Sequence, residues 1–154
     1  MARNAILFSL LVFSIFSALS MRDVLLMSDL NGQTILPLGI ASLNLNYTFN
    51  MGVNFGFASD ASKFRQLQLV ALALLVCFAI IIWGMRSATR WAPFIAGLFA
   101  GGGLANALER FFYDGVFDYL NVEFIFFENP FSFNVADIYI FLGLLIFIFP
   151  ASEK

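Results

Sequence analysis

Two aspartates, Asp118 and Asp137, are the residues whose positions point most directly to chemistry. Asp137 is followed by twelve uncharged residues, so its carboxylate lies at or just inside the boundary of an apolar helix. A charge there costs free energy, and such residues usually face a bundle interior or a cavity. The structural alternative is an acid that stabilises a helix N-terminus. Asp118 lies nineteen residues earlier, and its apolar neighbours indicate a partly shielded site.

The pair carries more information than either acid alone. The sequence has no histidine, and its single cysteine, Cys77, lies inside an apolar run. These features exclude Ser-His and Cys-His catalysis, the usual zinc sites and a disulfide within the chain. Two acids that share a site cannot both ionise easily, so one holds a proton while the other takes one from water. Asp118 and Asp137 therefore predict aspartic-protease chemistry, with a titration that belongs to the pair.

Asn106 and Arg110 are four residues apart, on one face at the end of an apolar stretch. Arg110 could neutralise a carboxylate or bind a lipid phosphate, and Asn106 could donate to a peptide carbonyl. The structural alternative is an arginine that extends its head group to the membrane interface. Nearby, Gly97 and Gly101 form a GxxxG pattern, which predicts close helix packing within the chain or between chains.

Four apolar stretches must position these residues. The 154-residue chain is 61% hydrophobic and only 12% charged, too apolar for a water-facing surface, and predicts a single membrane domain over residues 1–154. Each stretch is near the ~20 residues that a helix needs to cross the hydrocarbon core. The first resembles a cleaved signal peptide, but the later spans favour a retained helix. The expected helices are at about 5–21, 67–85, 91–108 and 131–149.

The distribution of charge predicts the orientation. With four spans, both termini share one side with the short loop 86–90, and that side carries Arg3, Arg86, Arg90 and Lys154. The other side collects nine of the ten acidic residues. The positive-inside rule therefore places both termini in the cytoplasm and segments 22–66 and 109–134 outside.

The outward segments carry strand signals. From Leu43 to Phe57, apolar and polar residues alternate strictly, which predicts a strand or hairpin with one apolar face. Residues 121–127 could add another strand. The sequence thus predicts a mainly α membrane protein with four transmembrane helices and a small extracytoplasmic β-sheet, which could lie on lipid or hold an extended peptide.

Four motifs, in this order and topology, resemble the bacterial lipoprotein signal peptidases (signal peptidase II), which are four-helix membrane aspartyl proteases. The first looks like the family's Asn-x-Gly-x-x-Phe segment, and the last matches its Phe-Asn-x-Ala-Asp. The motifs are Asn50-Met51-Gly52-Val53-Asn54-Phe55-Gly56, Gly102-Gly103-Leu104-Ala105-Asn106 followed by Arg110, Gly115-Val116-Phe117-Asp118-Tyr119, and Phe133-Asn134-Val135-Ala136-Asp137.

The resemblance implies that Asp118 and Asp137 are the catalytic pair. It also implies that four polar residues line the site around substrate and dyad: Asn50, Asn106, Arg110 and Asn134. The family cleaves the signal peptide of prolipoproteins just before a diacylglyceryl-modified cysteine, at the periplasmic side of the bacterial inner membrane. The outward sheet would support the substrate at the interface. No cofactor or metal is expected, and the expected partners are prolipoproteins and membrane lipids.

The sequence departs from the family in two places. Glu109 stands where the family usually has aspartate before the arginine. The family's Asp-Gln-x-x-Lys at the end of the first helix is missing, and the chain has Ser17-Ala18-Leu19-Ser20-Met21-Arg22-Asp23 there. If that motif anchors the sheet, Arg22 and Asp23 would have to substitute for it.

Other classes of protein remain as alternatives. A non-catalytic subunit of a larger membrane complex could retain the peptidase scaffold, although an idle carboxylate at Asp137 would be a standing cost. A transporter would show broken helices in paired halves, and the sequence shows none. The Gly-x-Gly-Asp signature of presenilin-type proteases is absent, although Tyr113-Asp114 resembles its partner motif. A net charge of −2 without any basic run does not support nucleic-acid binding.

Overall fold

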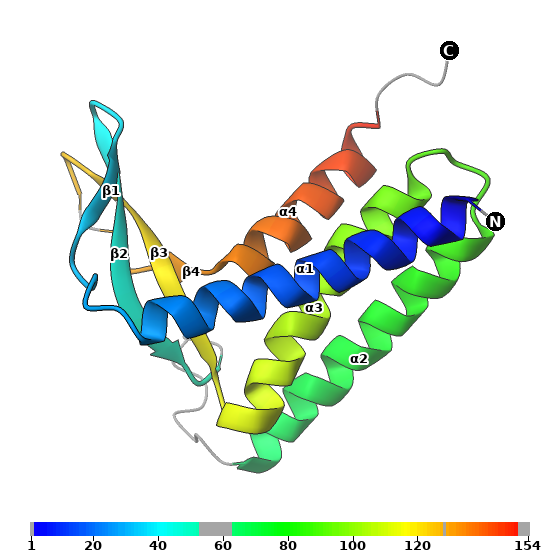
Figure 1. Cartoon of the computed structure of the whole chain (residues 1–154), viewed down its shortest axis with the longest axis horizontal. Coiled ribbons are helices and arrows are strands. Elements are labelled where there is room, and N and C mark those ends of the chain that lie inside the picture. Colours follow the sequence, from blue (N-terminus) through cyan, green and yellow to red (C-terminus); the bar gives the residue numbers. More distant parts are fainter. Residues whose placement is uncertain (1, 53–62, 128, 151–154) are drawn as a thin grey trace.

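The computed structural model describes residues 2–52, 63–127 and 129–150. In these ranges the chain forms four helices and four strands (Figure 1). One helix is followed by two strands, two helices, two more strands and a last helix. The helices are α1 (Ala2–Leu26), α2 (Lys63–Arg86), α3 (Ala92–Tyr113) and α4 (Val135–Ile148). The strands are β1 (Thr34–Pro37), β2 (Ala41–Asn50), β3 (Val116–Phe124) and β4 (Ser132–Phe133).

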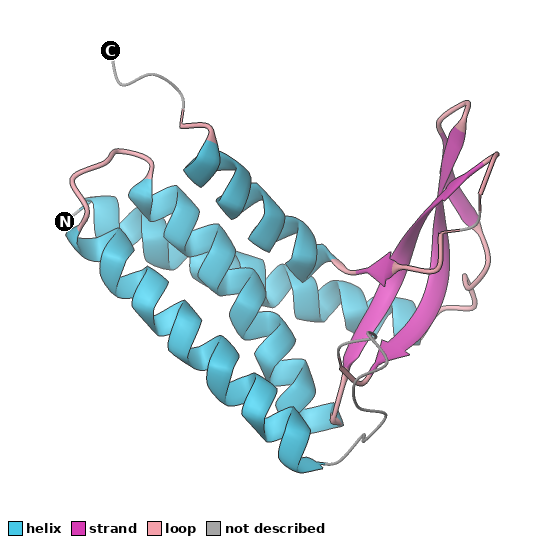
Figure 2. Cartoon of the chain, turned by 180° about the vertical axis from the view of Figure 1, so that it is seen from behind, coloured by secondary structure: helices cyan, strands magenta, loops and turns pink. Residues whose placement is uncertain are grey.

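The sheet projects from one end of the helix bundle, as both views show (Figures 1 and 2). The start of α1, the loop between α2 and α3 and the end of α4 lie at the opposite end (Figure 1). There the guanidinium of Arg3 donates to the carbonyl oxygens of Ser87, at 2.6 Å, and Thr89, at 2.9 Å. The molecule therefore has a sheet end and a loop end.

Glycines let α3 pack closely against each of the other helices. A Cβ at Gly97 would lie 2.7 Å from the Cβ of Leu10, and one at Gly101 would lie 2.6 Å from the Cβ of Ser14, both on α1. Gly102 faces the Ala136 carbonyl of α4, and Gly103 faces the sulfur of Cys77 on α2. The GxxxG pattern thus serves packing within the chain, by letting backbones approach closely.

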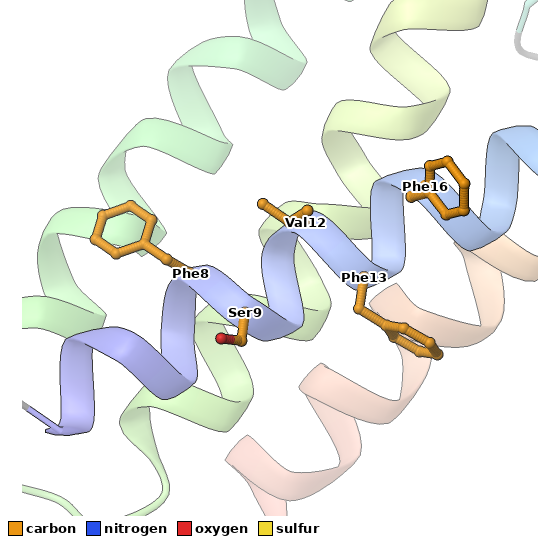
Figure 3. A pocket seen from close by; sticks show the side chains of 5 residues that line it. All are labelled: Phe8, Ser9, Val12, Phe13 and Phe16. Carbon is orange, nitrogen blue, oxygen red and sulfur yellow. The ribbon is translucent and has the colours of Figure 1, made fainter.

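The outer surface of the bundle is apolar. Figure 3 shows Phe8, Val12, Phe13 and Phe16 along one side of α1, and their exposed fractions run from 48% to 72%. By length and composition α1 and α2 could each cross a membrane, and α4 is a shorter apolar helix. A soluble protein rarely exposes so much contiguous apolar surface, so these side chains are suited to contact with lipid.

Four helix boundaries differ from the sequence-based expectation by four or five residues. α2 begins at Lys63 instead of near Leu67, and α3 continues to Tyr113 instead of ending near Leu108. α1 continues to Leu26 instead of ending near Met21, because Arg22 is buried and ion-paired rather than in solvent. α4 begins at Val135, four residues later than expected, because Ser132 and Phe133 pair with β3 as strand β4. An apolar run that looks like helix in the sequence is therefore divided between a strand and a helix.

The four strands form an antiparallel sheet in the order β1-β2-β3-β4. The predicted alternation is confirmed as β2 up to Asn50, whereas residues 53–57 lie outside the described part of the chain. The strand expected over residues 121–127 is β3, which begins at Val116 rather than at Asn121 and therefore includes Asp118. A buried cluster joins α1 to one face of this sheet: Leu25, Leu45, Phe117 and Tyr119.

Replacing Gly102 with alanine tests the contact between α3 and α4. The new Cβ would overlap the carbonyl oxygen of Ala136, and overpacking of this kind costs about 1–3 kcal/mol. We expect Gly102→Ala to lower the melting temperature of the purified protein in detergent. Ser9→Thr, which adds one methyl at an exposed position of α1, is the matched control and should leave it unchanged. An unchanged melting temperature in Gly102→Ala would contradict the close contact.

Candidate active site

Asp118 is held in the middle of the molecule by strand pairing. It lies opposite Thr48 of β2, and its side chain is buried, with 4% of the residue exposed. The Nδ2 atom of Asn50, at the end of β2, donates to Asp118 Oδ2 at 3.0 Å. The Nδ2 atom of Asn134 donates to Asp118 Oδ1 at 2.9 Å. Each carboxylate oxygen therefore has a fixed amide donor.

Asp137 is held by the start of α4. Asn134 is the N-cap, and its side-chain oxygen accepts from the Asp137 backbone N–H at 3.1 Å. In return, Asp137 Oδ2 accepts from the Asn134 backbone N–H at 3.0 Å, which completes a capping box. The structure therefore shows the helix-capping role of Asp137, and this role is compatible with the one expected of Asp137 in the dyad.

Asn106 connects α3 to this arrangement. Its Nδ2 atom donates to Asp137 Oδ1 at 2.8 Å, and its Oδ1 atom accepts from Asn134 Nδ2 at 3.1 Å. The amide of Asn134 thus contacts Asn106 and Asp118 at once, while its backbone contacts Asp137. Five of the six residues expected at the site belong to one hydrogen-bond network, and both carboxylates are joined through Asn134.

Arg110, the sixth expected residue, lies at the edge of the network. Its Nη1 atom donates to the Asn50 carbonyl oxygen at 3.4 Å and to Gln66 Oε1 at 3.2 Å. Gln66, almost fully buried, in turn donates to the carbonyl of Met51. Gln66 cannot be recognised as a site residue from the sequence, because a polar residue just before an apolar run is typical of a membrane interface.

Burial determines the electrostatics of Asp118. It raises the pKa of Asp118 to about 6, and the nearby charge of Asp137 acts in the same direction. The hydrogen bonds from Asn50 and Asn134 and the positive charge of Arg110 lower the pKa of Asp118 and offset part of this effect. Asp118 therefore holds a proton at a pH where an exposed aspartate has lost it.

The arrangement suits general acid–base chemistry better than metal chemistry. The raised pKa lets Asp118 keep its proton to a higher pH than an exposed aspartate, and Asp137 belongs to the same network with its oxygens fixed by N–H donors. Within the described residues, no group of three histidine, cysteine or acidic side chains could hold a metal ion. A protonated and an ionised carboxylate together can give and take protons at one substrate bond.

Two further buried charges lie close to the dyad. Glu109 accepts from the backbone N–H of Phe117, the residue before Asp118, and Arg22 of α1 lies beside it. In the sequence Glu109 and Arg22 stand out only because they depart from the family pattern. Their burial could not be predicted because it depends on contacts between segments far apart in the chain. Asp114, by contrast, is the half-exposed C-cap of α3.

Comparison with known proteins shows the family to which the chain belongs. A sequence model of the family described as signal peptidase (SPase) II matches residues 7–151. The lipoprotein signal peptidase of Rickettsia felis is 31% identical over 122 residues, which cover 78% of this chain and 61% of that protein. The enzyme of the same name from Aeromonas hydrophila is 29% identical over 130 residues, covering 78% of this chain and 77% of that protein.

A solved structure has the same architecture. A chain titled as a bacterial membrane enzyme superposes with a TM-score of 0.74 at 18% identity, over 96% of this chain and 93% of its own. The protein is thus a membrane protein with a helical bundle and a small antiparallel sheet. It belongs to the signal peptidase II family. The chain spans about three fifths of the length of some of its relatives. Its match to the Rickettsia protein, for example, covers 61% of that protein.

The raised pKa of Asp118 predicts a pH-dependent stability. The unfolded carboxyl has a pKa of about 3.9, and the folded one of about 6. Between these values the folded state binds more protons than the unfolded state, so stability falls as the pH rises. The loss attributable to Asp118 is about 3 kcal/mol. The side chain introduced by Asp118→Asn cannot titrate, so the variant lacks this loss of stability. The melting temperature of the variant minus that of the wild type should therefore increase from pH 4 to pH 7. A constant difference would show that burial does not raise this pKa.

Proposed function

We propose that this protein is an aspartic-type endopeptidase that removes signal peptides from diacylglyceryl-modified prolipoproteins, with Asp118 and Asp137 as the catalytic pair. The single observation that supports this most strongly is the network through Asn134, which holds both carboxylates at the point where the sheet meets the bundle. The family to which the chain belongs supports the substrate class.

The two carboxylates take different roles in the proposed mechanism. Burial favours the proton on Asp118, so Asp118 acts as the acid that protonates the scissile carbonyl oxygen. Asp137 acts as the base that takes a proton from the attacking water. When the tetrahedral diol collapses and the C–N bond breaks, Asp137 gives its proton to the leaving amine and Asp118 takes a proton from a diol hydroxyl. The pair thereby returns to its starting protonation. No metal or cofactor takes part.

The four polar residues hold this pair and the substrate. Asn50 and Asn134 fix the oxygens of Asp118, and Asn106 fixes Asp137. Arg110 supports the end of β2 through the Asn50 carbonyl and places a positive charge beside both acids. In the proposed mechanism these residues also stabilise the negative charge that develops on the peptide carbonyl in the transition state.

We further propose that all four helices cross a bacterial inner membrane, with both termini in the cytoplasm. The loop end of the molecule carries Arg3, Arg86 and Arg90, which fits the cytoplasmic side. The sheet and the dyad then face the periplasm. Exposed apolar side chains on the sheet and its loops, among them Ile40 and Phe126, suit a position at the membrane surface, where the lipid-modified cysteine of a substrate lies.

Cleavage of a diacylglyceryl-modified prolipoprotein by the purified protein tests the function directly. We expect Asp118→Asn and Asp137→Asn each to lower kcat by about 10²–10⁴-fold, because each removes one proton-transfer step. Asp114→Asn is the matched control, since Asp114 is a half-exposed C-cap whose ion pair with Lys63, at 3.7 Å, lies on the surface. Its rate should equal that of the wild type.

Two outcomes would contradict the proposal. One is cleavage that persists in both dyad variants, which would place the chemistry elsewhere. The other is a well-folded wild-type protein that cleaves none of several prolipoproteins. The alternative, a non-catalytic subunit of a larger membrane complex, would then be examined by identifying the proteins that co-purify with the chain.

Asn50→Ala tests the assignment of Asp118 as the acid. The hydrogen bond from Asn50 lowers the pKa of Asp118, so its removal moves that pKa above about 6. Asp118 then stays protonated to higher pH, and the alkaline limb of the kcat–pH profile should move upward. The lost hydrogen bond should also reduce kcat about tenfold. Asn46→Ala, at an exposed position of the same strand, should change neither quantity. If the alkaline limb of the Asn50→Ala profile moved downward or did not move, Asp118 would not be the acid.

A further inference from the structure

Arg22 and Glu109 are two charged side chains buried outside the dyad. Arg22 is 8% exposed and Glu109 3%, although charges are rarely buried without partners. The Nε atom of Arg22 lies 3.4 Å from Glu109 Oε2. The guanidinium also stacks 3.8 Å from the centre of the Tyr113 ring. α1 therefore places a fixed cation beside a carboxylate of α3, and the attraction is strengthened by the low polarity around them.

Glu109 uses the same oxygen to hold the strand that carries Asp118. Its Oε2 atom accepts from the backbone N–H of Phe117 at 2.9 Å, in a fully buried contact. In the described residues, β4 pairs with Leu120 and Asn121, so it does not extend along β3 as far as Phe117. At the Asp118 end, β3 thus has β2 on one side and the Glu109 carboxylate on the other. Glu109 takes the place of a missing strand partner.

The contact fixes the backbone immediately before the catalytic acid. Phe117 precedes Asp118 directly, and the Asp118 carboxyl is also held by the amides of Asn50 and Asn134. If Phe117 lost its acceptor, the buried N–H would need another partner and the end of β3 would shift. If Arg22 lost its charge, Glu109 would be an unpaired buried carboxylate, which is strongly unfavourable.

We propose that the buried pair Arg22–Glu109 positions the Asp118 carboxyl for catalysis, by holding the N–H of Phe117 at the open edge of β3. Both are positioning residues that act through Phe117 and do not touch the reacting atoms. The inference rests on the proposed peptidase function for its kinetic consequence and on the described contacts for its structural one.

The kinetic test separates positioning from binding. Glu109→Met keeps the length of the side chain and removes the acceptor of the Phe117 N–H, and Arg22→Met keeps the stem and removes the cation. We expect each to lower kcat about 10²-fold with KM within about twofold, since a small misplacement of a catalytic group has this effect. Arg22→Lys restores the charge and should recover most of kcat. Asp23→Asn is the matched control, because Asp23 contacts the same guanidinium at 2.6 Å while its side chain is 60% exposed.

An infrared measurement of the Asp118 carboxyl gives a readout that does not need turnover. The band is assigned by its loss in Asp118→Asn, and its frequency and titration midpoint are compared among the variants. We expect Glu109→Met and Arg22→Met to displace the band and Asp23→Asn to leave it in place. Should these two variants fail to fold, Glu109→Asp and Arg22→Lys take their place. The shorter side chain of Glu109→Asp holds Phe117 less firmly, so this variant should displace the band and lower kcat. Arg22→Lys should leave the band in place and keep most of kcat.

The results distinguish the possible failures. A lower melting temperature with unchanged kcat and an unchanged Asp118 band would show that the pair only stabilises the fold, which overturns the inference. A wild-type protein that cleaves no prolipoprotein would overturn the proposed function, while the infrared comparison would still decide whether the pair positions Asp118.

Discussion

The structure depends on how one helix begins in an apolar environment. The first N–H groups of any helix lack partners within the helix, and near a membrane they cannot rely on water. Asn134 and Asp137 meet this need for α4 with a reciprocal capping box. The same Asn134 amide reaches Asn106 on α3 and Asp118 on β3. The interaction that starts the helix is therefore also the interaction that assembles the site, and neither could be changed alone.

The remaining architecture brings the other partners to this point. Small residues along α3 allow α1, α2 and α4 to approach it, so α3 lies at the centre of the bundle. β2 and β3 extend the site beyond the helices, and the cluster that includes Leu25 and Tyr119 attaches them to α1. Charged and amide side chains gather at the sheet end of α3, where Asn106, Glu109 and Arg110 follow each other within five residues.

The sequence predicted those elements whose residue pattern lies within one short segment. The apolar run after Asp137 and the alternation before Asn50 are visible in the sequence, and both elements exist. The strand around Asp118 was predicted too late because its pairing with Thr48 joins residues 70 positions apart. α1 was predicted too short because Arg22 looks like a boundary until its partner 87 positions away is known. Gln66 and Glu109 look like interfacial residues for the same reason, and only the fold shows them buried.

The contact between Gly102 and Ala136 has a mechanical consequence. Membranes differ in thickness, and helices respond by tilting. Gly102 lies four residues from Asn106, and Ala136 is adjacent to Asp137, so the two backbones touch almost at the dyad itself. A tilt of α4 against α3 would therefore turn about this contact beside Asp137, and displacement would grow toward the far ends of the helices. The distance between the carboxylates of Asp118 and Asp137 would then change little with the thickness of the surrounding lipid.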